Sequence, residues 1–194
     1  MEKNKLRDIL QTALRDDTAY HLALEVARKN CKGKIWLIGG AVYKTIASGL
    51  YGLKISTKDF DFVIEKATKD LVLPEDWKAI ENKHGNLKLN NDSIDIDLIP
   101  LDNIHSIQER GLEPDILNFL SGVPLTIHSI AFDIDKQELI GDIGIQSILK
   151  KTIDINNQQE YDYVANMYDG KYSVDRYAKD LGFCPPGGRT SGSY

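Results

Sequence analysis

The stretch Ile35–Glu65 reads IWLIGGAVYKTIASGLYGLKISTKDFDFVIE, and the rest of the chain can be placed around it. Its first four residues are apolar and lead directly into Gly39 and Gly40. A short apolar run bounded by glycines is typical of a buried strand that stops at a tight turn. The stretch therefore predicts a strand over 35–38 and a glycine turn immediately after it.

A helix is predicted after this turn. Val42, Ile46 and Leu50 recur at helical spacing, so they would lie on one face of the helix. Gly49 and Gly52 predict its end, because glycine favours the positions at which helices stop. A loop would then connect the helix to the next alternating segment.

Two aspartates alternate with phenylalanines after this loop, which contains Ser56 and Thr57. Side chains two residues apart in a strand point to the same face, so Asp59 and Asp61 would project together while the phenylalanines pack into the core. Like charges this close raise one pKa unless a proton or a cation neutralises them. Oxygen ligands favour Mg²⁺ or Mn²⁺. The pair therefore indicates a metal site, and the solvated face of an edge strand is the alternative.

A second strand with aspartates on one face is predicted further along the chain. The polar segment 66–82 predicts a loop with a short helix that begins near Pro74 or Glu75, and 84–86 predicts a turn. Alternation from Leu87 and a hairpin turn over 90–92 then lead into a strand over 93–99. This strand carries two more aspartates, for which a solvated hairpin face is again the alternative. They are Asp95 and Asp97.

The segment before the first strand predicts helical structure. Apolar residues over 4–30 form a helical stripe that is interrupted by polar residues 15–18, so the segment is one amphipathic helix or a broken pair. Asp17 or Thr18 would cap the second piece. We expect the segment to pack on the back of the sheet.

Composition excludes some classes of function. The net charge of -5 and the pI of about 5.4 provide no bulk attraction to polyanions such as RNA. Cys31 and Cys184 lack metal-ligand spacing and no signal peptide is recognisable, so we expect reduced thiols in a cytoplasmic protein. No apolar run has the length of a membrane span.

The sequence resembles the head domain of polymerase-beta-like nucleotidyltransferases in four consecutive features. These are a strand, the glycine pair, a helix and the segment KDFDFVI over 58–64. The resemblance is to the bacterial poly(A) polymerase and tRNA CCA-adding family in particular. It implies an α+β fold, a mixed sheet with helices packed on one face. It also implies that the glycine turn lies against a nucleoside triphosphate, that Asp59 and Asp61 bind catalytic metals, and that a neighbouring strand supplies a third carboxylate. Alignment with the family favours Asp97 over Asp95 for this role.

The resemblance continues to Phe183. Residues 126–153 follow the family layout of a helix, a hairpin, a glycine turn and a second helix, and VDRYAKDLGF over 174–183 resembles the family's Arg-Phe-Ala to Leu-Gly-Phe helix. It implies that Arg176 lies near the nucleotide cleft. We therefore expect one head domain over 1–183 and a disordered tail rich in Pro, Gly and Ser over 184–194.

Three segments depart from the family pattern. The chain has Val42-Tyr43-Lys44 where the family has Val-Arg-Asp, and residues 122–125 (GVPL) stand where an Arg-Arg-Asp-Phe motif contacts the nucleotide. His128 stands where the family has an asparagine. Its side chain would either contact the nucleotide or form a hydrogen bond with a backbone carbonyl. The segments that read bases and hold tRNA have no counterpart after Phe183, so the resemblance does not extend to these roles.

The expected chemistry is phosphoryl transfer by the two-metal route. Amides of Gly39 and Gly40 would face the phosphates at the helix N-terminus, and Lys44 or Lys58 would add positive charge unless they are solvated surface lysines. The predicted enzyme transfers a nucleoside monophosphate from an NTP such as ATP to a hydroxyl of an RNA 3′ end, a protein or a small molecule, and releases pyrophosphate. The alternatives are a non-catalytic nucleotide-binding or regulatory module and a small transferase of a mobile element that acts on tRNA or a partner protein.

Overall fold

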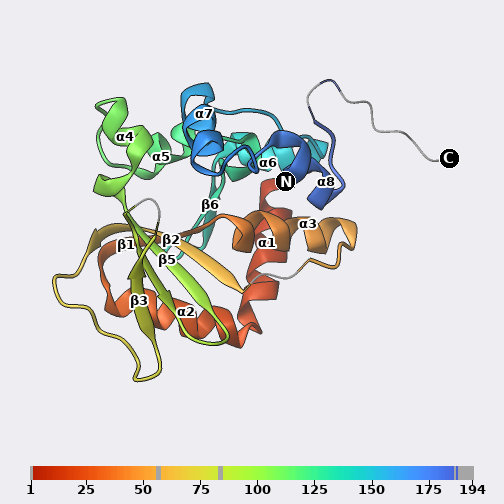
Figure 1. Ribbon diagram of the computed structural model, residues 1–194. Helices are drawn as coiled ribbons and strands as arrows, with labels where there is room; N and C mark the ends of the chain where they lie inside the picture. The colour runs from red at the N-terminus through yellow and green to blue at the C-terminus, as the bar shows by residue number, and fades with distance from the viewer. Residues whose placement is uncertain (1, 56–57, 83–84, 186, 188–194) are drawn as a thin grey trace.

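The computed structural model describes residues 2–55, 58–82, 85–185 and 187. Within these ranges seven strands form one sheet in the order β3-β4-β5-β2-β1-β6-β7 (Figure 1). β2 and β5 run parallel, and the other neighbouring pairs run antiparallel. The predicted α+β mixed sheet is confirmed. The strands are β1 (Cys31–Ile38), β2 (Asp59–Ala67), β3 (Lys78–Glu81), β4 (Leu87–Asn90), β5 (Asp95–Pro100), β6 (Ala131–Asp133) and β7 (Glu138–Ile140).

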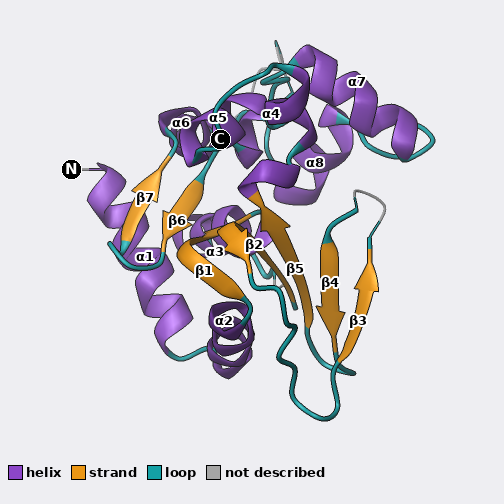
Figure 2. Ribbon diagram, turned by 90° about the vertical axis from the view of Figure 1, so that its left-hand side faces the viewer, coloured by secondary structure: helices purple, strands orange, loops and turns teal. Residues whose placement is uncertain are grey.

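The helices separate into an N-terminal group beside the sheet and a later group at one end of it (Figure 2). Within the described ranges they are α1 (Glu2–Arg15), α2 (Thr18–Lys29), α3 (Gly40–Tyr51), α4 (His105–Glu109), α5 (Ile116–Gly122), α6 (Asp142–Lys150), α7 (Gln158–Met167) and α8 (Val174–Leu181). Two short 3-10 turns are η1 (Leu101–Asn103) and η2 (Thr126–His128). The later group, α4 to α8, supplies one wall of the site described below.

Helices α1, α2 and α3 build the main core against one face of the sheet. The predicted broken pair is confirmed, because α1 ends at Arg15 and α2 starts at Thr18 after the cap Asp17, whose side chain accepts from the backbone N–H of Tyr20 at 3.0 Å. Alternate strand residues face these helices and the others face away. The buried residues of this core include Leu6, Leu10, Val42, Ile46, Phe60, Phe62, Ile96 and Leu98.

A smaller core occupies part of the opposite face. Trp36 and Val63 pack there with Phe119 and Leu120, which come from α5. Val63 follows Asp61 by two residues and therefore lies on the same face of β2. Helices α1 to α3 thus cover one face of the sheet. Helix α5 covers the end of the opposite face, next to the acidic residues.

Helix α3 begins after the glycine turn, as predicted, but one detail of its predicted end is wrong. Gly52 stops the helix in the left-handed conformation, as predicted, but Gly49 lies inside it. A Cβ on Gly49 would collide with the side chain of Ile9. Gly49 therefore lets α1 approach α3 closely and does not end the helix.

The predicted helix near Pro74 or Glu75 is wrong. The backbone turns at this point, with the Trp77 N–H bonded to the Pro74 carbonyl at 3.1 Å, and then enters β3. All four residues of β3 are exposed, so this edge strand has no buried face that would mark it in the sequence. Ser56, Thr57 and His84 lie outside the described residues, as do 186 and 188–194 of the predicted tail.

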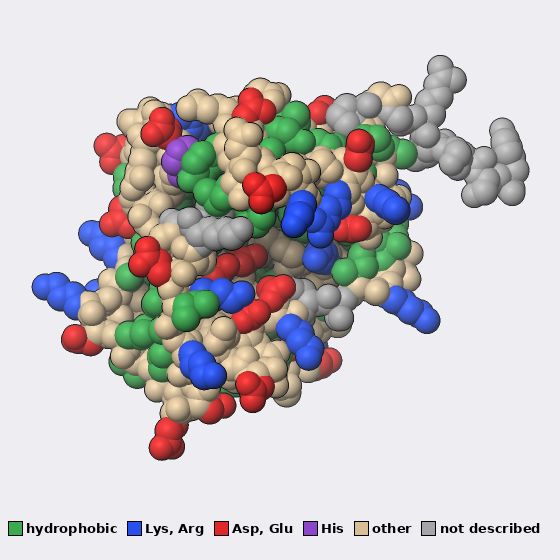
Figure 3. Space-filling model, in the orientation of Figure 1, with side chains coloured by type: hydrophobic (Ala, Val, Ile, Leu, Met, Phe, Trp, Pro, Cys, Tyr) green, Lys and Arg blue, Asp and Glu red, His purple; other side chains and the backbone are tan. Residues whose placement is uncertain are grey.

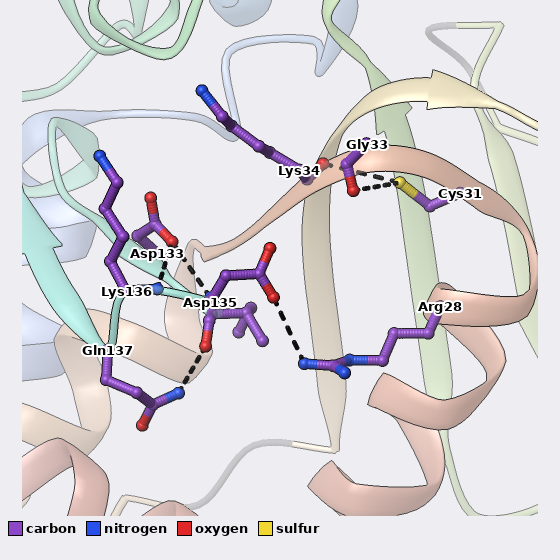
Figure 4. Close-up of polar contacts among 9 residues, drawn as sticks. Arg28, Cys31, Gly33, Lys34, Asp133, Asp135, Lys136 and Gln137 are labelled. Atoms are coloured by element: carbon purple, nitrogen blue, oxygen red, sulfur yellow. Dashed lines mark hydrogen bonds and ion pairs between the residues drawn. The ribbon is translucent and has the colours of Figure 1, made fainter.

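The hairpin of β6 and β7 follows the predicted layout, and its turn is tied to α2 (Figure 4). The Asp133 carboxylate accepts from the backbone N–H groups of Asp135 and Lys136 at 3.1 and 2.9 Å, and Asp135 is ion-paired with Arg28 at 3.5 Å. Cys31 and Cys184 are free thiols. Among the residues that the structure describes, no helix is both long and apolar enough to cross a bilayer.

Candidate active site

Four carboxylates lie on one face of the two parallel strands at the centre of the sheet. The register places Asp59 opposite Asp95 and Asp61 opposite Asp97. Their side chains face away from the main core, because the alternate residues Phe60, Phe62, Ile96 and Leu98 are buried in it. We call Asp59, Asp61, Asp95 and Asp97 the acidic face. It consists of two rows, and the pairing of Ile38 with Asp61 places the Asp61–Asp97 row nearer to the glycine turn.

The glycine turn lies directly against this row. Gly39 has a φ of +66°, and a Cβ at this position would collide with Oδ2 of Asp61. Both the backbone conformation and the close approach therefore require glycine here. Gly40 opens α3, and its neighbour in space is the side chain of Lys44. The positive end of the α3 dipole and the Lys44 ammonium thus lie beside the acidic face.

Asp61 is a buried carboxylate of the acidic face with a perturbed pKa. Burial and the negative charges of Asp97 and Asp59 raise its pKa to about 7, and Lys88 and Lys44 oppose this rise. Repulsion of this kind is relieved by a proton or by a cation. Asp61 is therefore held in a position where a bound cation would lower the free energy of the site.

The donor set of the acidic face fits a divalent cation of the Mg²⁺ or Mn²⁺ type. Its ligands are hard carboxylate oxygens, and the repulsion at Asp61 is the kind that such an ion removes. Within the described ranges no three His, Cys, Asp or Glu side chains are already grouped as a preformed metal site. The inference that the acidic face fits a divalent cation therefore rests on the chemistry of its carboxylates and on the register of β2 and β5.

The two carboxylates of β5 have different partners. Asp97 accepts from the side-chain amide of Asn82 at 3.3 Å, whereas Asp95 is ion-paired with the Lys88 ammonium at 3.2 Å. Burial acts to lower the pKa of Lys88, but the hydrogen bond and the charge of Asp95 raise it above its usual value. Asp95 is thus engaged by a cation from the protein itself.

A pocket of about 470 Å³ lies beside the acidic face, between α3 and the C-terminal helices. Figure 3 shows Asp and Glu side chains gathered in a hollow of the surface, with Lys and Arg side chains next to them. The charge of Lys44 acts on both Asp61 and His128 and so connects the acidic face with the pocket. The pocket is lined by Lys44, Pro124, His128, Val164, Tyr168, Lys171, Tyr172, Arg176, Tyr177 and Asp180.

Three tyrosines line this pocket together with His128, and we call Tyr168, Tyr172 and Tyr177 the tyrosine wall. The Tyr172 hydroxyl and Nδ1 of His128 are hydrogen-bonded at 3.1 Å, and the ring of Tyr177 meets the His128 ring edge-on at 4.9 Å between centroids. Burial and the charge of Lys44 lower the pKa of His128 to about 4, and burial raises the pKa of Tyr172. His128 and Tyr172 are therefore neutral at pH 7, and the rings offer aromatic surface to a ligand.

No family model matches the chain, and no curated protein sequence matches it. Solved structures do match. A CCA-adding enzyme in complex with ATP is 16% identical with a TM-score of 0.59 over 91% of this chain. The Bacillus stearothermophilus CCA-adding enzyme with CTP is 17% identical with a TM-score of 0.60 over 88% of this chain. The Thermotoga maritima CCA-adding enzyme with tRNA is 15% identical with a TM-score of 0.51 over 92% of this chain.

The chain has the nucleotidyltransferase fold. The resemblance to the polymerase-beta-like head domain is thereby confirmed at the level of the fold. The chain spans 41%, 42% and 44% of the three matched proteins, so less than half of each of them has a counterpart here. ATP, CTP and tRNA are ligands of those proteins.

The nucleotidyltransferase fold brings most of the predicted residues together. Gly39 adjoins Asp61, and Gly40 adjoins Lys44, whose charge acts on Asp61. Arg176 on α8 lines the pocket, with its Nη1 donating to the Lys171 carbonyl at 3.0 Å. Lys58 is exposed and is not among the described residues that line the pocket. Its backbone carbonyl accepts a hydrogen bond from the Asp95 N–H at 3.1 Å.

The departures from the family pattern have a structural explanation. A Cβ on Gly122 would meet the side chains of Ser106 and Arg110, so this position has no room for an arginine. The positive charges in the pocket come from other segments, namely Lys44, Lys171 and Arg176. His128 is bonded to a tyrosine hydroxyl, and the predicted alternative of a backbone carbonyl partner is not the contact found here.

Sequence reasoning missed the tyrosine wall and Lys171. A compositional signal was present, because five of the nine tyrosines fall between 161 and 177. The nucleotidyltransferase resemblance drew attention to Arg176 in this segment and to no aromatic residue. The contact between Tyr172 and His128 joins residues 44 positions apart, and no local pattern encodes it.

Proposed function

We propose that the chain is a metal-dependent nucleotidyltransferase, which moves a nucleoside monophosphate from an NTP to a hydroxyl acceptor and releases pyrophosphate. One observation carries this proposal. The acidic face meets the glycine turn at Asp61, and a pocket with three cations and a tyrosine wall adjoins both. Metal-ligand chemistry, a phosphate-binding turn and aromatic surface thus occur in one place.

The glycine turn and the neighbouring cations would hold the triphosphate. The N-terminus of α3 directs backbone N–H groups toward an anion, and its dipole adds to the attraction. Lys44 and Arg176 supply charge from opposite elements of the pocket. Because a guanidinium donates in a fixed fork, Arg176 is suited to two phosphate oxygens at once.

The carboxylates Asp59, Asp61 and Asp97 would hold the metal ions. Bound Mg²⁺ supplies charge stabilisation at the phosphorus and lowers the pKa of an acceptor hydroxyl. The protein's own part is to fix the carboxylates on two hydrogen-bonded strands, so that the nucleotide and the acceptor are oriented for in-line attack. Ligation would also remove the repulsion that raises the pKa of Asp61.

The tyrosine wall would receive the nucleoside part of the NTP. Neutral His128 and the tyrosine rings present stacking surface, and base stacking on aromatic side chains is favourable and tolerant of sequence. The matched CCA-adding enzymes were solved with ATP and CTP, which supports an NTP as the substrate. The acceptor would be the hydroxyl of an RNA 3′ end, a protein or a small molecule.

Pyrophosphate release tests the proposal. Wild type would be assayed with Mg²⁺ and each of the four NTPs, with bulk tRNA and a cell lysate as acceptors, beside the Asp59→Asn/Asp61→Asn double variant. Asp16→Asn is a matched control, because this exposed aspartate lies between α1 and α2. We expect release by wild type and the control only. Mg²⁺-dependent NTP binding without release would contradict the enzyme and favour a non-catalytic nucleotide-binding module.

A further inference from the structure

A second pocket, of about 440 Å³, lies between α1, α2 and the hairpin of β6 and β7 (Figure 2). Its floor includes the buried side chains of Leu14, Phe132 and Ile134, which belong to the main core. The pocket therefore opens on the face of the sheet that the helices α1 to α3 cover, and the acidic face lies on the opposite side. Its volume is in the range of small-molecule sites, which are mostly apolar with a few polar groups.

The three elements around this pocket are tied to one another in pairs. Nε2 of His21 on α2 is 2.8 Å from the carbonyl oxygen of Arg15 at the end of α1. The side-chain amide of Gln11 on α1 donates to the Gln137 carbonyl in the hairpin at 3.3 Å. The ion pair described above joins the hairpin to α2 (Figure 4). The pocket is thus formed before a ligand binds, and a ligand would lose little affinity through the ordering of its walls.

The pocket carries positive charge although the chain as a whole is negative. The chain has 29 Asp and Glu residues against 24 Lys and Arg residues, but none of the described residues that line this pocket is acidic. Arg15 and Arg28 both line it, and Arg28 is paired with Asp135 at 3.5 Å. One positive charge is left in excess among these three side chains. This balance matches a ligand with a single negative charge.

Tyr20 adds an uncharged donor to the pocket. The residue is only 5% exposed, and among the residues that the structure describes none is hydrogen-bonded to its hydroxyl. Burial raises the pKa of Tyr20 to about 12, and the positive charge of Arg28 opposes this rise, so the hydroxyl keeps its proton at pH 7. A buried hydroxyl without a partner gains from an acceptor that a ligand brings. A guanidinium and a phenol O–H are thus available to the same anion.

We propose that this pocket binds a small organic carboxylate, with the carboxylate group at Arg15 and the Tyr20 hydroxyl and an aromatic or aliphatic body on the apolar floor. The two oxygens of a carboxylate match the fork of donors on a guanidinium. A phosphate monoester would bring a second negative charge for which the pocket has no counterpart. The inference goes beyond the proposed function, because this ligand and an NTP would bind on opposite faces of the sheet.

The test is a titration of the whole chain with 2-naphthoate, followed by NMR of the backbone amides. 2-Naphthamide has the same body without the charge, acetate has the charge without the body, and 2-naphthyl phosphate carries a second charge. We expect 2-naphthoate to shift the amides around the pocket and to bind about 10-fold or more tightly than 2-naphthamide and acetate. 2-Naphthyl phosphate should bind no more tightly, and saturating ATP with Mg²⁺ should not displace 2-naphthoate.

Variants of two arginines on α1 separate the pocket from general electrostatic attraction. Arg15→Met should weaken 2-naphthoate binding by about 10- to 30-fold and leave 2-naphthamide binding unchanged, because only the charged contact is lost. Arg7→Met is the matched control, since Arg7 contacts Asp8 and is not among the described residues that line the pocket. Tyr20→Phe should weaken 2-naphthoate binding by about 3- to 10-fold.

Four results would overturn the inference. They are absence of 2-naphthoate binding, equal affinities for 2-naphthoate and 2-naphthamide, equal affinities of Arg15→Met and Arg7→Met for 2-naphthoate, and displacement of 2-naphthoate by ATP. Tighter binding of 2-naphthyl phosphate than of 2-naphthoate would overturn the carboxylate as the ligand class.

Discussion

The two sides of the candidate site are built in different ways. The acidic face comes from alternation along β2 and β5, with ligands two residues apart and strands in direct register. The tyrosine wall comes from packing between η2 and the C-terminal helices, and its central hydrogen bond joins residues 44 positions apart. Local periodicity therefore identifies the chemistry of the site, whereas the surface that would select the ligand emerges only with the tertiary structure.

The two sides also differ in how their polar groups are satisfied. Burial and nearby like charges raise the pKa of Asp61 to about 7, so it would gain from a bound cation. His128 is neutral because burial and Lys44 lower its pKa, and it is already hydrogen-bonded to Tyr172. The acidic face thus carries repulsion at Asp61 that a bound cation would relieve, while His128 and Tyr172 are hydrogen-bonded to each other without a ligand. The predictions below test this difference.

The largest expected effect is on turnover. Asp61→Asn should reduce pyrophosphate release by about 10³-fold or more, because a carboxylate that would hold the proposed catalytic metals is lost. The same change should raise the melting temperature of the metal-free protein, because it removes a repelled charge. Calorimetry with EDTA and a pyrophosphate assay would measure both quantities. Lower activity together with lower stability would indicate that Asp61 has a structural role instead.

A smaller effect is expected on the other side of the site. Arg176→Ala should weaken NTP binding by about 10- to 30-fold, because a charge-assisted contact to the phosphates is lost. Binding of the corresponding nucleoside, which has no phosphates, should stay the same. Arg28→Ala is a matched control, since Arg28 is paired with Asp135 on the hairpin of β6 and β7. Equal losses for the NTP and the nucleoside would show that Arg176 does not act on phosphate.

The glycine turn can be tested with two glycines of similar backbone conformation. Gly39 and Gly52 have φ values of +66° and +68°, so alanine should cost about 1 kcal/mol of stability at either position. Only the Gly39 Cβ would collide with Asp61, and nothing lies within 4 Å of the Gly52 Cβ. Titration should therefore show weakened Mn²⁺ binding for Gly39→Ala and normal binding for Gly52→Ala. Equal Mn²⁺ affinities of the two variants would show that the glycine turn does not affect the metal site.

A further effect is expected on the dependence of stability on pH. The pKa of Asp61 is raised in the folded protein, so the folded state binds a proton more tightly than the unfolded state. The metal-free protein should lose stability as the pH rises from about 4 to about 7, by up to about 3–4 kcal/mol. Asp61→Asn should flatten this part of the profile, and saturating Mg²⁺ should restore stability above pH 7. A variant profile parallel to wild type over this range would contradict the assignment.

Several features of the fold could be predicted because they depend on local patterns. The glycine turn, α3 and the alternation of Asp59 to Phe62 are encoded within one stretch, and Asp17 marks the break between α1 and α2. The edge strand β3 could not be predicted, because its four residues are exposed and carry no burial pattern. Edge strands with two solvated faces lack the hydrophobic period on which such predictions depend.

Only part of the candidate site could be predicted from the sequence. Periodicity placed Asp95 and Asp97 on one face but could not say which of them faces Asp61, because that depends on the parallel register of β2 and β5. The strands β2 and β5 are distant in sequence, so their pairing leaves no mark in the sequence of either strand alone. The hairpin of β4 and β5 is local and could be predicted, but the ion pair of Lys88 with Asp95 depends on its exact register.

The affinity for NTP with and without Mg²⁺ tests most directly whether the acidic face and the pocket act on one ligand. Isothermal titration would compare wild type with Asp61→Asn and Arg176→Ala. We predict that Mg²⁺ strengthens NTP binding to wild type by about 10-fold or more, that Asp61→Asn abolishes this gain, and that Arg176→Ala weakens binding but keeps the gain. An unchanged Mg²⁺ dependence in Asp61→Asn would contradict the account.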